Sequence, residues 1–228
     1  MLRDLLHLFF PELCLACRET LLEHEKTICN SCFVGLPRTN FHMQKGNEAE
    51  RIFIGRIPVE SAASCYFFNQ GSRVQELLHQ LKYKNQPEAG EIVGEWYGKE
   101  LLKTETFAKA DFIVPVPLHP KKQKQRGYNQ AEHFAIGMGR GTGIPVVTDW
   151  LLRTRSSDTQ TKKNKFSRWQ GVESVFSFNP LERVEGKHFL LVDDVLTTGA
   201  TLEACAVAMY KFEKEIKISI ATIAYAQR

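Results

Sequence analysis

The stretch FLLVDDVLTTGATLEACAVAMYKF, residues 189–212, decides the fold. It joins an apolar run to an amphipathic one through two adjacent acids, Asp193 and Asp194, and a turn rich in hydroxyl groups and glycine. In an open parallel sheet, ligands bind beyond the carboxyl ends of the strands, so we expect both acids at the ligand edge. The stretch therefore predicts a strand, a binding loop and a helix.

The turn after the acids has the composition of a phosphate site. Backbone N–H groups at the start of a helix bind anions, helped by the positive end of the helix dipole. Gly199 lets the backbone approach a phosphate, and Thr197, Thr198 and Thr201 can donate hydrogen bonds. Two carboxylates beside a phosphate need ribose hydroxyls or a hydrated Mg²⁺ between them. The alternative is a simple helix cap, for which one Asp would suffice.

Apolar runs and amphipathic stretches alternate along the chain from Val59 onward. Strands are expected over residues 61–68, 111–116, 145–148, 188–192 and 216–225. Helices are expected over residues 74–84, 130–138 and 200–212. This alternation predicts an α/β fold with a parallel sheet covered on both faces. Two lysine-rich stretches, 121–126 and 162–168, interrupt the pattern and are expected as mobile surface loops.

Composition narrows the class of protein. The formal net charge of +4 is too weak to indicate a nucleic-acid partner by itself. The first ten residues are apolar, but Asp4 interrupts them and no small-residue cleavage site precedes Pro11, so we expect a short amphipathic helix or a hydrophobic lead-in there. No stretch approaches the ~20 consecutive apolar residues of a membrane-spanning helix. We therefore expect a soluble, cytoplasmic protein with one substantial core.

Four cysteines near the N-terminus form two CxxC pairs, Cys14/Cys17 and Cys29/Cys32, separated by eleven residues. This spacing predicts a zinc site of the ribbon type, in which four thiolates close a structural tetrahedron. Two disulfides are the alternative, which a cytosolic location disfavours. We expect a zinc-binding module over residues 1–40, a linker over 41–58 and the main domain over 59–228.

The loop VDDVLTTGAT, residues 192–201, resembles the PRPP motif of type I phosphoribosyltransferases. The resemblance implies their fold, a parallel sheet flanked by helices with a hood and a flexible loop, and a 5-phosphoribosyl-1-pyrophosphate (PRPP) ligand. It gives Asp193 and Asp194 the catalytic position facing the ribose hydroxyls, with Mg²⁺ held partly through ligand and water. The loop residues implied in PRPP binding are Val195, Leu196, Thr197, Thr198, Gly199, Ala200 and Thr201.

A second likeness covers nearly the whole chain. Residues 114–130 (VPVPLHPKKQKQRGYNQ), residues 81–83 (LKY) and the paired cysteines resemble the ComF family. The position of Pro115 and Val116 implies the pyrophosphate-binding turn. Arg126 is the candidate for a direct phosphate contact, because a guanidinium fork matches phosphate oxygens, and a solvated surface charge is its alternative.

Two details complete the comparison with the ComF family. His119 is expected as a structural turn residue and not as a general base. Gly171 departs from the family pattern, because many ComF-like sequences carry Asn in this stretch.

Two functions follow from these resemblances. One is a phosphoribosyltransferase that displaces pyrophosphate from its donor with an acceptor that the sequence does not identify. The other is a competence factor for natural transformation that binds single-stranded DNA and interacts with other competence proteins. In this second function the PRPP site is regulatory or non-catalytic. The basic stretches and the aromatic residues Tyr128, Phe166 and Trp169 could serve the second, since exposed aromatic rings stack on bases.

Overall fold

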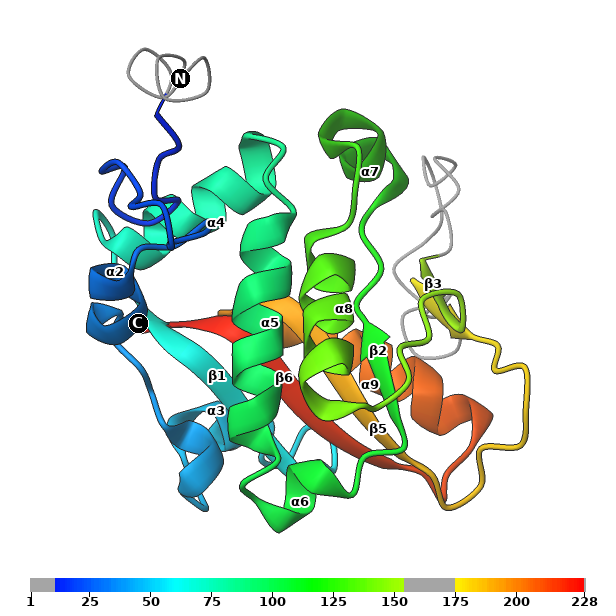
Figure 1. The fold of residues 1–228 in the computed structure, drawn as a ribbon. Helices are drawn as coiled ribbons and strands as arrows, with labels where there is room; N and C mark the ends of the chain where they lie inside the picture. Colours follow the sequence, from blue (N-terminus) through cyan, green and yellow to red (C-terminus); the bar gives the residue numbers. More distant parts are fainter. Residues whose placement is uncertain (1–10, 154–174, 228) are drawn as a thin grey trace, which may run out of the picture.

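The computed structural model describes residues 11–153 and 175–227 (Figure 1). A parallel sheet of order β1-β6-β5-β2 forms its centre. These strands are β1 (Ser61–Phe68), β6 (Lys217–Ala226), β5 (His188–Leu196) and β2 (Phe112–Pro115). A separate antiparallel pair consists of β3 (Leu151–Arg153) and β4 (Phe176–Phe178). The α/β fold with a parallel sheet is therefore confirmed.

Helices cover both faces of the sheet (Figure 1). They are α2 (Asn30–Gly35), the 3₁₀ helix η1 (Phe41–Met43), α3 (Glu48–Arg51), α4 (Arg73–Tyr83), α5 (Glu88–Leu101), α6 (Glu105–Ala108), α7 (Pro120–Arg126), α8 (Gln130–Thr142) and α9 (Ala200–Phe212). Helices α5 and α8 lie on one face and α9 lies on the other. Because both faces are covered, the first six residues of β1 and the first five of β5 are all buried, as expected for strands of a parallel sheet between two layers of helices.

Helices α5 and α8 approach each other closely through glycine. A Cβ on Gly137 would lie 2.0 Å from the Glu91 carbonyl oxygen, and one on Gly94 would lie 2.3 Å from that of Phe134. Helix α8 ends at Thr142, four residues beyond its predicted end at Met138. No sequence pattern predicts α5. Glycine usually weakens a helix, but here it is what permits the contact between the two helices.

Three local expectations were wrong. Residues 121–126 form most of α7 and not a loop, because Pro120 suits the first turn, Lys, Gln and Arg favour helix, and Gly127 ends it at φ 84°. The predicted strand 145–148 is reduced to one bridge, Ile113 with Val146. Strand β5 continues past Val192 to Leu196, so the two acids lie within the strand and not after it.

The segment 41–58, expected as a linker, is folded against the main sheet. Phe53 is fully buried, and the Asn47 amide donates a 3.0 Å hydrogen bond to the Ala62 carbonyl of β1. Residues of the cysteine module also reach the main domain, since Phe33 packs edge-on against Trp96 of α5 with ring centroids 5.6 Å apart. These contacts join the cysteine module to α5 and segment 41–58 to β1.

Some sequence expectations lie outside the described residues. They are the helix over residues 1–10, the basic stretch 162–168 with Phe166 and Trp169, and the departure at Gly171. No helix within residues 11–153 and 175–227 is both long enough and apolar enough to cross a membrane.

Candidate functional site

Asp193 and Asp194 lie near the carboxyl end of β5, where that strand pairs with β6. The backbone N–H of Asp194 donates a 2.8 Å hydrogen bond to Asp193 Oδ1. Burial of the carboxyl group and the neighbouring Asp194 carboxylate raise the pKa of Asp193 to about 8. The pair therefore favours partners that compensate its negative charge.

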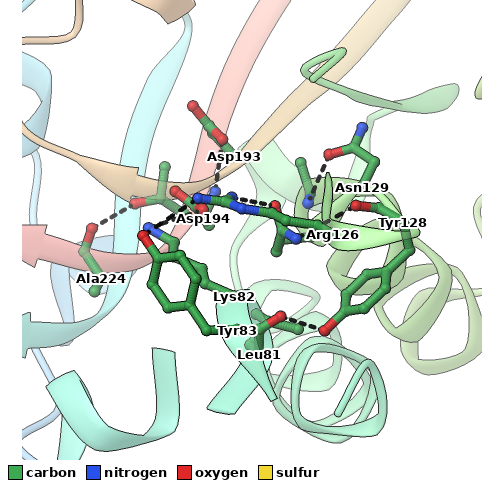
Figure 2. Close-up of polar contacts among 12 residues, drawn as sticks. Leu81, Lys82, Tyr83, Arg126, Tyr128, Asn129, Asp193, Asp194 and Ala224 are labelled. Carbon is green, nitrogen blue, oxygen red and sulfur yellow. Dashed lines mark hydrogen bonds and ion pairs between the residues drawn. The ribbon is translucent and has the colours of Figure 1, made fainter. Parts of the chain in front are cut away.

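Lys82 provides one such partner (Figure 2). It lies in the last turn of α4, and its Nζ is 3.0 Å from Asp194 Oδ2. Only 22% of the lysine side chain and 18% of the aspartate side chain are exposed. An ion pair with this little solvent contact is screened less than a surface pair. In the sequence Lys82 stands out only as part of the LKY triplet, which does not by itself predict a site residue.

The loop after β5 turns into α9 through a glycine in the left-handed conformation. Gly199 precedes α9 with φ 72°, and a small cavity of about 40 Å³ lies at this point. Its lining comprises Asp193, Val195, Thr197, Thr198, Gly199, Ala200, Thr201 and Leu202. Asp193, the threonines and the start of α9 are therefore brought together around one space, and this arrangement suits an anion beside hydroxyl groups.

Residues from the N-terminal half of the chain contact the loop after β5. Arg56 Nη1 donates a 2.7 Å hydrogen bond to the Thr198 carbonyl oxygen, and the same side chain pairs with Glu203 of α9. Ile52 and Phe53 pack so closely that a Cβ on Gly199 would lie 2.7 Å from Ile52 Cγ2. No sequence pattern predicted these contacts, because they join residues far apart in the chain.

The turn after β2 lies next to the acids in the sheet. Pro115 pairs with Val192, the residue before Asp193, and the Val116 N–H donates a 2.8 Å hydrogen bond to the Val192 carbonyl oxygen. Asn129 Nδ2 donates to the Val116 carbonyl oxygen at 3.0 Å. Asn129 also caps α8 by accepting from the Ala131 N–H, so one amide fixes both the turn and the helix.

Arg126, at the end of α7, is held above this edge and is not a freely solvated charge. Its Nη1 donates to Gln130 Oε1 at 2.7 Å, and its guanidinium carbon lies 5.1 Å from the centre of the Tyr83 ring. At the start of the same helix, His119 Nδ1 accepts a hydrogen bond from the Lys121 N–H at 3.2 Å. The His119 side chain therefore caps the start of α7.

A larger cavity of about 470 Å³ adjoins the loop. It is lined by Glu48, Ile52, Arg56, Thr197, Thr198, Tyr225 and Gln227. Thr197 and Thr198 also line the small cavity, so the two cavities share this part of the loop.

Cys14, Cys17, Cys29 and Cys32 form a compact cluster, and their sulfur atoms all lie within 4.8 Å of one another. The Cys17 and Cys29 sulfurs are 3.8 Å apart, the separation that a tetrahedral zinc site with Zn–S bonds of about 2.3 Å requires. All six cysteines of the chain lie in the described residues as free thiols, so the four are not paired as disulfides.

Backbone hydrogen bonds within the cluster also suit thiolates. The Ala16 and Cys29 N–H groups donate to the Cys14 sulfur at 3.4 and 3.3 Å. Burial raises the pKa of Cys14, but donors including the Cys29 N–H outweigh it and bring the pKa to about 7. The cluster can therefore hold a metal ion such as zinc.

Known proteins resemble the chain in sequence over this same region. The family model for the phosphoribosyl transferase domain matches residues 79–228. The chain belongs to this family. This domain contains the acid pair, the loop after it and the turn after β2, whereas Arg56, Ile52 and the cysteine cluster precede it.

Curated relatives extend the match to the N-terminal residues. DNA utilization protein YhgH of Escherichia coli K12 is 27% identical over 86% of this chain and 89% of its own length. Competence protein ComFC of Bacillus subtilis is 26% identical over 93% of this chain and 83% of its own length. With the domain match and the cysteine cluster, these relatives confirm the resemblance to the ComF family.

Among solved structures, the glutamine PRPP amidotransferase of Bacillus subtilis is similar, with 24% identity and a TM-score of 0.42. The match covers 62% of this chain and 30% of the longer enzyme.

Proposed function

We propose that the chain binds PRPP with Mg²⁺ through the acid pair and the loop after β5. The observation that carries the proposal is the shared cavity, in which Asp193 and residues 197–201 face one space at the start of α9. A phosphorylated sugar presents an anion and a diol, and this cavity offers backbone N–H groups for the first and the Asp193 carboxylate for the second.

In the proposed complex, each end of the donor has its own part of the site. Asp193 and Asp194 accept hydrogen bonds from the ribose hydroxyls, and residues 196–201 surround the 5′-phosphate. The turn at Pro115 and Val116 faces the pyrophosphate, where Arg126 provides a guanidinium. The carboxylate donor set suits Mg²⁺, which when bound neutralises charge on the phosphates.

A transferase reaction is the activity that we propose for this site. The bond between C1 of the sugar and the pyrophosphate oxygen breaks, the acceptor forms a new bond to C1, and pyrophosphate leaves. The residues of the chain contribute by fixing the sugar and the leaving group in place, which is a large part of catalysis when reactants are held in line. Mass spectrometry with PRPP, Mg²⁺ and a panel of bases and amines tests this activity, and no product from any acceptor would count against it.

Binding itself can be tested by thermal unfolding. A ligand that binds only the folded state stabilises it by about 2.7 kcal/mol at 100 times its dissociation constant. PRPP with Mg²⁺ should therefore raise the melting temperature of the wild-type protein. The Asp193→Asn/Asp194→Asn variant should show no rise. Equal rises in both proteins would contradict the proposed role of the acids.

Single-stranded DNA is a second candidate ligand, which the helix α7 supports. Lys121, Lys122 and Lys124 are exposed on α7, beyond the carboxyl edge of the sheet (Figure 1). The relatives' names refer to DNA utilization and competence, and we propose the same setting, with other competence proteins as partners. Affinity for a single strand should fall steeply with salt and weaken when the three lysines become glutamine. Affinity that is independent of salt would exclude a phosphate-binding surface.

For the cysteine cluster we propose a structural zinc ion held by all four thiolates. A module of about 40 residues has too small a core to fold alone, so metal binding supplies much of its stability. We propose that residues 1–40 form this module and that residues 59–228 form the phosphoribosyltransferase-like domain. Residues 41–58 connect the two parts and contribute Ile52, Phe53 and Arg56 to the outer side of the loop.

A further inference from the structure

We propose that Lys82 is a further donor-binding residue, whose ammonium contacts the pyrophosphate of the donor while Asp194 anchors it. The inference rests on the proposed function and names a contact beyond it.

The end of α4 connects three parts of the site through consecutive residues (Figure 2). The Leu81 carbonyl oxygen accepts a hydrogen bond from the Tyr128 hydroxyl. Lys82 forms the ion pair with Asp194. The Arg126 guanidinium packs over the Tyr83 ring, and the Tyr83 hydroxyl accepts a 3.4 Å hydrogen bond from Arg126 Nη2. These contacts fix the backbone of α4 relative to the acid pair.

The anchored ammonium has hydrogen-bonding capacity left for a ligand. A lysine ammonium offers three N–H donors. Within residues 11–153 and 175–227, Asp194 is the one ion-pair partner of Lys82. The lysine side chain is 22% exposed, so the ion pair with Asp194 does not enclose it completely. Lys82 can therefore keep its contact with Asp194 and donate to a second anion.

The pyrophosphate is the anion that this position favours. In the proposed complex the 5′-phosphate lies at the other end of the sugar, at the loop that precedes α9 and lines the small cavity. The proposed pyrophosphate turn pairs with β5 at Val192, next to Asp193, so it lies on the same edge as Lys82 and its partner Asp194. Arg126 reaches this edge from α7 and is already fixed by Gln130 and Tyr83. Lys82 pairs with Asp194, and Arg126 contacts Tyr83, the residue after Lys82, so two cations are available to a ligand that brings several negative charges and a diol.

The alternative role for Lys82 is compensation of charge in the acid pair alone. The two roles predict different effects of Lys82 on the affinities for two ligands. A lysine that contacts pyrophosphate favours PRPP over ribose 5-phosphate, which has the same diol and the same 5′-phosphate but no pyrophosphate. A lysine that only balances the acids affects both ligands equally.

The test compares these two ligands by calorimetry at one fixed Mg²⁺ concentration. Lys82→Met should lower the affinity for PRPP by about 10- to 100-fold, the range for a lost hydrogen bond to a charged group. Its affinity for ribose 5-phosphate should change by less than about threefold. Lys82→Arg, which keeps the charge and the ion pair with Asp194, should recover at least part of the PRPP affinity. Lys84→Met is the matched control, because Lys84 is exposed just after α4, and it should bind both ligands as the wild type does.

Equal losses for the two ligands in Lys82→Met, or an unchanged affinity for PRPP, would overturn the inference and leave the proposed function in place. Wild-type protein that binds neither ligand would overturn the proposed function, and the inference with it. Thermal unfolding of Lys82→Met and Lys82→Arg verifies that both variants are folded before their affinities are compared.

Discussion

Arg56 Nη1 and the carbonyl oxygen of Thr198 are joined by a 2.7 Å hydrogen bond, so a residue that precedes the matched domain holds the proposed phosphate loop. The Arg56 side chain also pairs with Glu203 in the first turn of α9. The backbone geometry of the loop therefore depends on a segment that is more than 100 residues away in the sequence.

Arg56→Ala should weaken PRPP binding by about tenfold, because the loop loses a charged hydrogen-bond donor to its backbone. Stability should change by no more than about 1 kcal/mol, since the ion pair is partly exposed. Calorimetry and thermal unfolding measure the two effects. Arg51→Ala is the control, because Arg51 contacts Gly46 and not the loop. Equal PRPP affinity in the wild type and in Arg56→Ala would show that the loop does not need this support.

Gly199→Ala should disturb both the loop and its packing. Its φ of 72° disfavours a side chain, at about 1–3 kcal/mol, and a Cβ would lie 2.7 Å from Ile52 Cγ2 and 2.9 Å from Phe53 Cε1. A loss of this size lowers the melting temperature by about 2–12 °C in a protein of this length.

Gly186→Ala separates backbone strain from the clash. Gly186 has the same φ of 72°, but a Cβ there would meet no atom of the described residues around it within 4 Å. We expect Gly199→Ala to melt at a lower temperature than Gly186→Ala and to bind PRPP more weakly. If the two variants behave alike in both measurements, close packing against Ile52 and Phe53 is not what requires glycine here.

Removal of metal should unfold the cysteine module. The purified protein should contain about one zinc per chain, and a strong chelator should release it and expose the amides of residues 14–32 to hydrogen exchange. Cys32→Ser should lose the metal, because the remaining three thiolates no longer close the site. Cys65→Ala is the control: it removes a buried thiol of β1 outside the cluster, and this variant should keep the metal. A module that stays protected without metal would exclude a structural zinc ion.

Asp111 should make stability depend on pH. Burial raises its pKa, but the His188 N–H at 2.8 Å and the Lys187 ammonium at 3.0 Å outweigh burial, so the pKa falls below its ordinary value of 3.8. A lowered pKa in the folded state gives stability that is present above the unfolded-state pKa and is lost as pH falls through the folded-state value.

Asp111→Asn should therefore melt lower than the wild type at pH 7. Since the pair is partly exposed, the loss should be at most about 1 kcal/mol, which corresponds to about 2–4 °C. Melting curves from pH 7 down to pH 2 should show the difference shrinking below pH 3.8. A difference that stays constant over this range would mean that the charge of Asp111 contributes nothing.

The elements with the strongest local patterns could be predicted from sequence. Strand β1 and helix α9 have the predicted boundaries, residues 61–68 and 200–212. The apolar run of β1 can only be buried between two layers, and the glycine turn fixes where α9 begins. The acid pair and its loop were found for the same reason, because strand, turn and helix are consecutive in the chain.

Long-range contacts explain most of what the sequence did not reveal. Helix α5 contains three glycines, which argue against a helix until α8 is seen to pack against them. The pair of Lys82 and Asp194 joins residues that no local pattern links. Helix α7 is different, since its lysines and glutamines are good helix formers, although their polarity alone suggests a loop.

The most direct test of PRPP binding at the acid pair is calorimetry of the intact protein with PRPP in the presence of excess Mg²⁺. We predict saturable binding at one site per chain for the wild type. We predict no measurable heat for Asp193→Asn/Asp194→Asn, in a variant that still unfolds cooperatively. Folded wild-type protein that gives no heat of binding with PRPP, or a double variant that binds PRPP as tightly as the wild type, would contradict this claim.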